Sequence, residues 1–104
     1  HTDMHPLTLD GLSDCVAVLK ASHTPVYFTI DLDCLDPSVF PGTGTPEAGG
    51  ITFLQLLEAM QEVSRCRIVG ADVNELAPML DTTGVSTATS CKVLRELLIA
   101  ILKK

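Results

Sequence analysis

The segment 26–33 constrains the fold of this chain more than any other, because it alternates strictly between apolar and polar residues. One face of an extended strand with this sequence carries Val26, Phe28, Ile30 and Leu32. The opposite face carries Tyr27, Thr29, Asp31 and Asp33. The pattern therefore predicts a strand with two carboxylates at its carboxyl end.

Helices are predicted on both sides of this strand by apolar residues spaced three or four apart. We expect them over 9–21, after a Thr8 cap, over 53–63, and from about 86 onward. Thr52 and Gln55 form a capping-box pattern ahead of the middle helix. A second strand is expected over 67–75. The last helix is expected to turn inward Leu94, Leu97, Leu98, Ile101 and Leu102.

The strand–helix–strand–helix order predicts parallel strands, a right-handed crossover and an α/β sheet covered on both faces. A length of 104 residues allows one compact unit. Two parallel strands do not make a self-sufficient sheet, so both should have further neighbours that this chain does not supply. We therefore expect residues 1–104 to be a single segment, the C-terminal portion of a larger α/β domain.

The composition of the chain limits the kinds of molecule that it could bind. The chain is 46% hydrophobic, which is too apolar for disorder, and its apolar runs are too short to cross a bilayer. Its 7 Lys and Arg against 13 Asp and Glu give a net charge of −6, which disfavours nucleic acid and anionic membranes and favours cations. The four cysteines lack CxxC spacing and are expected to be reduced, partly buried thiols. The histidines are too scattered for a zinc signature.

The stretch 34–50 holds three prolines and four glycines and is expected to be an ordered, shaped loop. Asp36, which precedes a proline, is expected to accept hydrogen bonds from the local backbone. The Gly42–Pro46 segment lacks the lysine of a phosphate-binding loop. Its glycines are expected to let the backbone approach a buried site closely.

Carboxylates gather where the strands are expected to end. In a regular strand the Cα atoms of Asp31 and Asp33 would lie about 6.6 Å apart with parallel side chains. Two carboxylates held that close repel each other unless a cation lies between them, and a pair of metal ions would suit them. Asp72 and Glu75 follow on the second strand, on opposite faces by strand parity. Taken singly, each acid is more often a turn cap or a solvated charge.

Three sequence stretches resemble the ureohydrolases, the arginase and agmatinase family. The first is Thr-Ile-Asp-Leu-Asp-Cys-Leu-Asp-Pro at 29–37, and the second is Pro-Gly-Thr-Gly-Thr-Pro-Glu-Ala-Gly-Gly at 41–50. The third, Gly-Ala-Asp-Val-Asn-Glu-Leu-Ala-Pro at 70–78, resembles the later G-x-D-x-x-E-x-x-P segment. The similarity extends from Val26 onward and is closer to agmatinases than to arginases.

The resemblance implies a three-layer α/β/α fold and a binuclear manganese enzyme. It implies that Asp31 and Asp33 are metal ligands, that Glu75 pairs with the substrate guanidinium, and that Thr45 shapes the wall of the site. A hydroxide held by the two metals would attack the guanidinium carbon and release urea and an amine. The family further implies a cytoplasmic enzyme of polyamine biosynthesis, commonly a trimer or hexamer.

The remaining family ligands lie in Gly-Gly-Asp-His and Asp-Ala-His-x-Asp segments that this chain lacks. The isolated chain is therefore expected to be inactive. One alternative is an incomplete module that binds divalent cations or a partner subunit through exposed strand edges. Another is a nucleotide-binding domain, which the missing phosphate-binding motif disfavours. The choice among agmatine, arginine and guanidinobutyrate as substrate stays open at this point.

Overall fold

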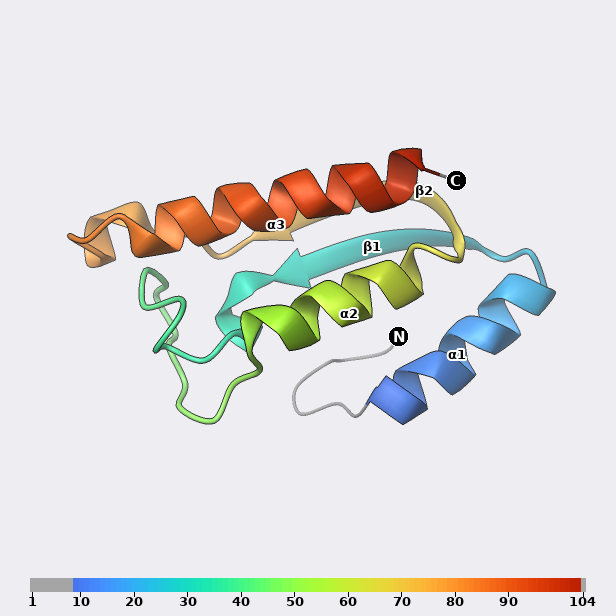
Figure 1. Ribbon diagram of the computed structural model, residues 1–104, viewed down its shortest axis with the longest axis horizontal. Coiled ribbons are helices and arrows are strands. Elements are labelled where there is room, and N and C mark those ends of the chain that lie inside the picture. The colour runs from blue at the N-terminus through green and yellow to red at the C-terminus, as the bar shows by residue number, and fades with distance from the viewer. Residues whose placement is uncertain (1–8, 104) are drawn as a thin grey trace.

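The computed structural model describes residues 9–103 (Figure 1). Its elements follow the expected order, and the Thr8 cap lies outside the described residues. Their bounds are α1 (Leu9–Ala21), β1 (Pro25–Asp31), the 3₁₀ turn η1 (Leu32–Cys34), α2 (Phe53–Val63), β2 (Arg67–Asn74), the 3₁₀ turn η2 (Pro78–Leu80) and α3 (Val85–Leu102). None of the helices within 9–103 is long and apolar enough to span a membrane.

The two strands pair in parallel, as predicted from the element order. Toward their carboxyl ends Thr29 lies opposite Asp72 and Asp31 lies opposite Asn74. The register shifts between Val26 and Tyr27, so the regular ladder runs through the carboxyl-terminal part of the pair. This register decides which polar residues meet at the end of the sheet.

The three helices pack against one face of the sheet (Figure 1). The main core joins this face to α2 and α3, and its buried members are Ile30, Leu32, Leu35, Phe40, Leu56, Met60, Val93 and Leu97. A second cluster joins α1 to α2 through Leu12, Val16, Ala59 and Cys66, with Val26 and Ile68 packed against it. We expected helices on both faces. Within 9–103 the other face carries polar and aromatic side chains instead, including exposed Tyr27.

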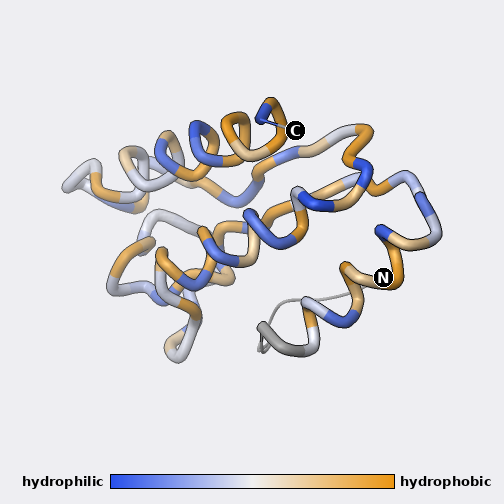
Figure 2. The backbone as a smooth tube through the Cα atoms, turned by 45° about the vertical axis from the view of Figure 1, so that its right-hand side comes forward, coloured by the Kyte–Doolittle hydropathy of each residue, from blue (hydrophilic) through white to orange (hydrophobic). Residues whose placement is uncertain are grey.

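α3 turns only part of its predicted face inward, since Leu97 is buried and Ile101 packs against the core as expected. Along this helix apolar and polar residues alternate turn by turn (Figure 2). Ser86, Ser90, Val93 and Leu97 are buried. The exposed leucines are Leu94, Leu98 and Leu102, so the expectation was wrong for these three. The two serines can face inward because each makes a hydrogen bond there, Ser86 with the Gly42 amide and Ser90 with the Ser86 carbonyl.

The start of α2 and the loop before it have the expected structure. The Thr52 hydroxyl accepts from the Gln55 amide while the Gln55 side chain accepts from the Thr52 amide, which is the predicted capping box. The loop is ordered by a short parallel bridge between Leu35 and Ile51 and by the side chain of Phe40, which is fully buried.

Phe40→Ala tests whether the loop is part of the core. Because the ring is fully buried among α2, α3 and β1 residues, its removal should lower the free energy of unfolding by about 3–5 kcal/mol. Leu54→Ala is the matched control, since Leu54 is 67% exposed on α2, and should change it by less than about 0.5 kcal/mol. Urea unfolding followed by circular dichroism measures both. An equal, small effect of the two substitutions would show that the loop does not depend on Phe40.

Candidate functional site

The strand register brings acidic residues of two segments to the carboxyl edge of the sheet. Asp31, the last residue of β1, lies opposite Asn74, the last residue of β2, and Glu75 follows directly. Neighbouring strands are about 4.8 Å apart and consecutive Cα atoms 3.8 Å apart, so the Cα atoms of Asp31 and Glu75 lie within about 9 Å. This edge is where open parallel sheets bind ligands.

Asp33 reaches the edge by a different route from the one predicted. β1 ends at Asp31, and Asp33 lies in the 3₁₀ turn η1 that follows, so strand parity does not govern its direction. Its position is set by Thr45, whose Oγ1 donates to Asp33 Oδ2 at 2.8 Å. Thr45, expected at the wall of the site, therefore contacts one of the candidate ligands directly.

Glu75 also lies outside its predicted strand. β2 ends at Asn74, and Glu75 has a φ of +81°, in the left-handed region that side-chain-bearing residues rarely adopt. The prediction that Asp72 and Glu75 project from opposite faces assumed a regular strand, and this assumption is wrong because the pleat stops before Glu75. Strained backbone of this kind costs on the order of 1 kcal/mol and is found preferentially at functional sites.

Gly42 connects the loop that carries Thr45 to the turn after Glu75. Its amide donates to Ser86 Oγ at 2.7 Å, and its carbonyl accepts from the Ala77 amide at 2.7 Å. A Cβ at this position would lie 2.7 Å from Ser86 Cβ, so only glycine fits without displacement. The expected close approach is confirmed for Gly42, which lies against the start of α3, and is wrong for Gly44, where an added Cβ would meet nothing within 4 Å.

Asp81 stabilises the α3 side of the contact between Gly42 and Ser86. Its Oδ1 accepts from the Thr83 amide and its Oδ2 accepts from the Ser86 amide at 2.8 Å. Hydrogen bonds from Ser86 and then Thr83 lower the pKa of the Asp81 carboxyl well below its usual range. Asp81 thereby fixes the first turn of α3, and with it the serine that holds Gly42.

The Asp72 carboxylate is hydrogen-bonded to side chains on the face of the sheet that the three helices do not cover. Its carboxylate accepts hydrogen bonds from Tyr27 at 2.8 Å, from Thr29 and from Asn74. These bonds, led by the one from Thr29, lower the pKa of Asp72, and the bond to Asp72 raises the pKa of Tyr27. Asp72 therefore braces β1 against β2 beside the site.

Asp36 accepts from the amides of Ser38 and Gly49 at 3.0 Å each, which confirms its expected structural role. These bonds, first those from Ser38, lower the pKa of Asp36. Next to it, burial followed by the negative charges of Asp33 and Asp31 raises the pKa of the Cys34 thiol to about 11. The negative charges of Asp33 and Asp31 that contribute to this raised pKa would also attract a cation.

Asp31 and Asp33 are suited to hold part of a metal site. Carboxylate oxygens are hard donors that suit Mn²⁺, Mg²⁺ or Ca²⁺. Thr45 engages one oxygen of Asp33, and Asp31 is exposed. Across 9–103, no group of three or more His, Cys, Asp and Glu side chains is arranged to hold an ion. The described residues therefore fit as a partial ligand set. The four cysteines, all within 9–103, are not joined in disulfides; the expected partial burial holds for Cys15, Cys34 and Cys66 and is wrong for Cys91, which is exposed.

Sequence reasoning missed Ser86 and Asp81, which act on the site from a distance. Ser86 has 0% exposure although serine has little apolar surface to bury. A signal was present in the spacing of Ser86 and Ser90, which puts two hydroxyls on one helix face, but the leucines farther along the helix gave the stronger apolar pattern.

Comparison with known proteins gives consistent matches. The model for the Arginase family matches residues 1–100. An agmatinase of Bacillus subtilis (strain 168) is 42% identical over 103 residues, which cover 96% of this chain and 36% of that protein. An agmatinase of Bacillus cereus is 44% identical over 86 residues, 81% of this chain and 30% of the relative. The chain thus spans about a third of the length of the curated relatives it matches.

Solved structures agree with the sequence matches. A protein from Clostridium difficile assigned as an agmatinase superposes with a TM-score of 0.81 at 47% identity, over 89% of this chain and 34% of that one. The arginase from Bacillus caldovelox superposes with a TM-score of 0.75 at 31% identity, over 86% and 30%. The expected α/β fold with a parallel sheet of the arginase type is therefore confirmed.

Asp81 should make stability depend on acidic pH. Its pKa is lower in the folded than in the unfolded state, so it stabilises the fold above the unfolded pKa, about 3.9, and this contribution is lost as pH falls below it. Asp81→Asn should reduce stability at pH 7 and flatten the decline below about pH 4. Asp14→Asn, the same charge change on an exposed position of α1, should leave the profile unchanged. Urea unfolding from pH 2 to 7 measures this, and matching profiles for wild type and Asp81→Asn would contradict it.

Proposed function

Because this chain belongs to the arginase family, we propose that it supplies part of the active site of a metal-dependent ureohydrolase. The reaction would hydrolyse a linear guanidino compound to urea and an amine. The proposal is supported by the position of Asp31 opposite Asn74, with Asp33 in the turn after β1 and Glu75 directly after β2, in a chain whose family match extends over residues 1–100.

In this proposal Asp31 and Asp33 contribute oxygen ligands to a pair of Mn²⁺ ions. The Thr45 hydroxyl orients the Asp33 carboxylate by holding Oδ2, which leaves the other oxygen to face a cation. When bound, two such ions supply Lewis acidity that makes a water molecule nucleophilic near neutral pH. The remaining ligands would come from parts of the family fold beyond this chain, since the described residues provide only a partial set.

Glu75 would bind the substrate cation. A guanidinium is planar and donates two parallel N–H bonds to one carboxylate, which fixes both its position and the direction of its plane. The left-handed turn at Glu75 and the anchoring of Ala77 to Gly42 hold the carboxylate where β2 ends. Capture of the guanidinium at this point presents its central carbon for attack at a fixed distance, which lowers the entropic part of the barrier.

The relatives named agmatinase favour agmatine as the substrate. The same proposal places the complete enzyme in the cytoplasm, within polyamine biosynthesis, as a trimer or hexamer. A test on the complete enzyme that contains this segment measures urea release from agmatine, arginine and guanidinobutyrate with and without Mn²⁺. We expect metal-dependent release that is fastest with agmatine. Absence of urea release from all three in the metal-loaded enzyme would contradict the proposal.

A second candidate is a catalytically incomplete module that binds divalent cations or a partner subunit. It is favoured by one observation, that within 9–103 the sheet has only two strands and the candidate ligands number fewer than three. Under this alternative the 104-residue chain binds a partner or cation without releasing urea. Urea release by the isolated chain would exclude it.

Asp31→Asn and Asp33→Asn should each lower bound manganese and turnover together. Loss of one charged ligand weakens the site, and removal of a single metal ligand or its close support typically costs at least 10-fold in affinity or activity. Metal content by atomic absorption and kcat for urea release measure the two effects in the complete enzyme. Asp14→Asn is the control with the same charge change on α1. Full metal content in both variants would remove the two residues from the metal site.

Glu75→Gln should separate substrate binding from metal binding. The neutral amide keeps the shape of the side chain but loses the charge-assisted pair with the guanidinium, worth about 1.5–3 kcal/mol. We therefore expect kcat/KM to fall at least 10-fold with metal content unchanged. Glu58→Gln on an exposed position of α2 is the control. Wild-type kcat/KM in Glu75→Gln would show that Glu75 does not contact the substrate.

A further inference from the structure

The positive charge of this acidic chain is concentrated in two places. Four of its seven Lys and Arg residues lie on α3 or directly after it. The other three are Lys20 near the end of α1 and the pair Arg65 and Arg67 where the chain enters β2, and all three line one cavity of about 650 Å³. His23 lines it as well, and no Asp or Glu does.

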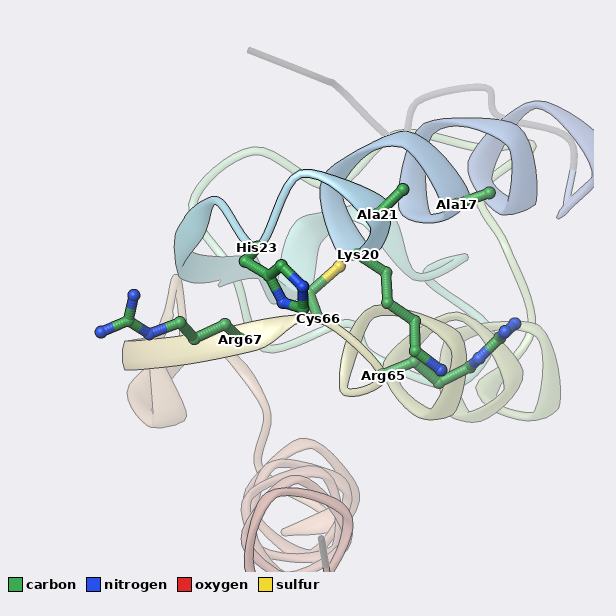
Figure 3. Close-up of a pocket in the computed structure, with 7 residues that line it drawn as sticks. All are labelled: Ala17, Lys20, Ala21, His23, Arg65, Cys66 and Arg67. Carbon is green, nitrogen blue, oxygen red and sulfur yellow. The ribbon is translucent and has the colours of Figure 1, made fainter.

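This cavity lies at the opposite end of the sheet from the acidic edge. It is formed by the end of α1, the turn into β1, and the connection from α2 into β2. In Figure 3, Lys20 and Arg65 reach toward the same side of the opening, while Arg67 extends on the other side of His23. Ala17, Ala21 and the buried Cys66 supply an apolar floor. The volume is within the range of small-molecule sites.

The carbonyl groups at the end of a helix carry partial negative charge, which repels an anion. At the end of α1 this repulsion is reduced because the last carbonyls already accept hydrogen bonds. The Val18 carbonyl accepts from Ser22, and the Leu19 carbonyl accepts from Thr24. The Lys20 carbonyl accepts from His23 at 3.2 Å, in a turn where His23 has a φ of +53°. The same turn that satisfies these carbonyls sets the imidazole at the cavity.

Arg65 forms an ion pair with Glu62 and still has N–H donors available for a ligand. Its Nη1 lies 2.8 Å from Glu62 Oε1, which steadies the guanidinium. A guanidinium has five N–H donors, so most of them stay available, and the side chain is 53% exposed. Glu62 compensates one charge of three, which leaves the lining positive.

We propose that this cavity binds a small molecule through a phosphate group. A planar carboxylate is satisfied by a single arginine, whereas the oxygens of a phosphate accept from donors on several sides. Lys20 and Arg65 come from different elements and supply such divergent donors, Arg67 adds positive charge, and the His23 ring can donate an N–H. The apolar floor suits the carbon body of a phosphate ester. Because β1 separates this cavity from the acidic edge by about 20 Å, the proposal is independent of the ureohydrolase function.

The test titrates the full chain with inorganic phosphate or with phenyl phosphate, at ionic strength held constant with chloride, and follows backbone amide shifts by NMR. We expect saturable shifts confined to residues 17–23 and 65–67. Tighter binding of phenyl phosphate identifies a phosphate ester as the ligand type, and equal binding identifies free phosphate. Either result supports the proposal.

Paired variants separate a site from general attraction. Lys20→Gln with Arg65→Gln should weaken phosphate binding at least 10-fold, and both side chains are exposed, so the fold should persist by circular dichroism. The control, Lys92→Gln with Arg95→Gln on α3, removes the same charge and should change affinity less than twofold. Shifts that do not saturate, that map outside the cavity, or that weaken equally in both double variants would overturn the proposal.

Discussion

The two hydrogen bonds of Gly42 hold the candidate site together. Through its amide it binds the Ser86 hydroxyl at the start of α3, and through its carbonyl it binds the Ala77 amide after β2. Three segments that are remote in sequence are thus joined at one residue without a side chain. Ser86 is buried and Asp81 fixes its amide, so the contact is anchored to the core as well as to the loop. Neighbouring donors and acceptors of this kind are costly to leave unpaired.

This junction links the two segments that hold Asp33 and Glu75. Thr45, three residues after Gly42, holds Asp33, and Glu75, two residues before Ala77, ends β2 in a strained turn. Asp72 and Asp36 beside them are fully committed to hydrogen bonds with neighbouring groups. On our proposal the acids at this edge divide into Asp36 and Asp72, which build the edge, and Asp31, Asp33 and Glu75, which are left to bind ligands.

The sequence predicted which helices and strands form better than it predicted where the strands end. Alternation and helical spacing identified all three helices and both strands, since each pattern reflects burial against a common core. The carboxyl ends of the strands were wrong by one or two residues, because nothing local in Asp33 or Glu75 reveals a 3₁₀ turn or a left-handed backbone. Those conformations are imposed by Thr45 and by the Gly42–Ala77 contact, which are tertiary. On α3 the spacing predicted Leu97 and Ile101 correctly but also placed Leu94, Leu98 and Leu102 inward, because the contact of Ser86 with Gly42 that turns the serines inward is tertiary.

The sheet thus has two ends of opposite character, an acidic edge suited to cations and a basic cavity suited to phosphate. The account depends most on the first. Anomalous diffraction at the manganese edge, from crystals of the complete enzyme containing this segment, tests it directly. The account predicts two peaks within coordination distance of carboxylate oxygens of Asp31 and Asp33. Manganese bound at positions that neither carboxylate contacts would contradict it.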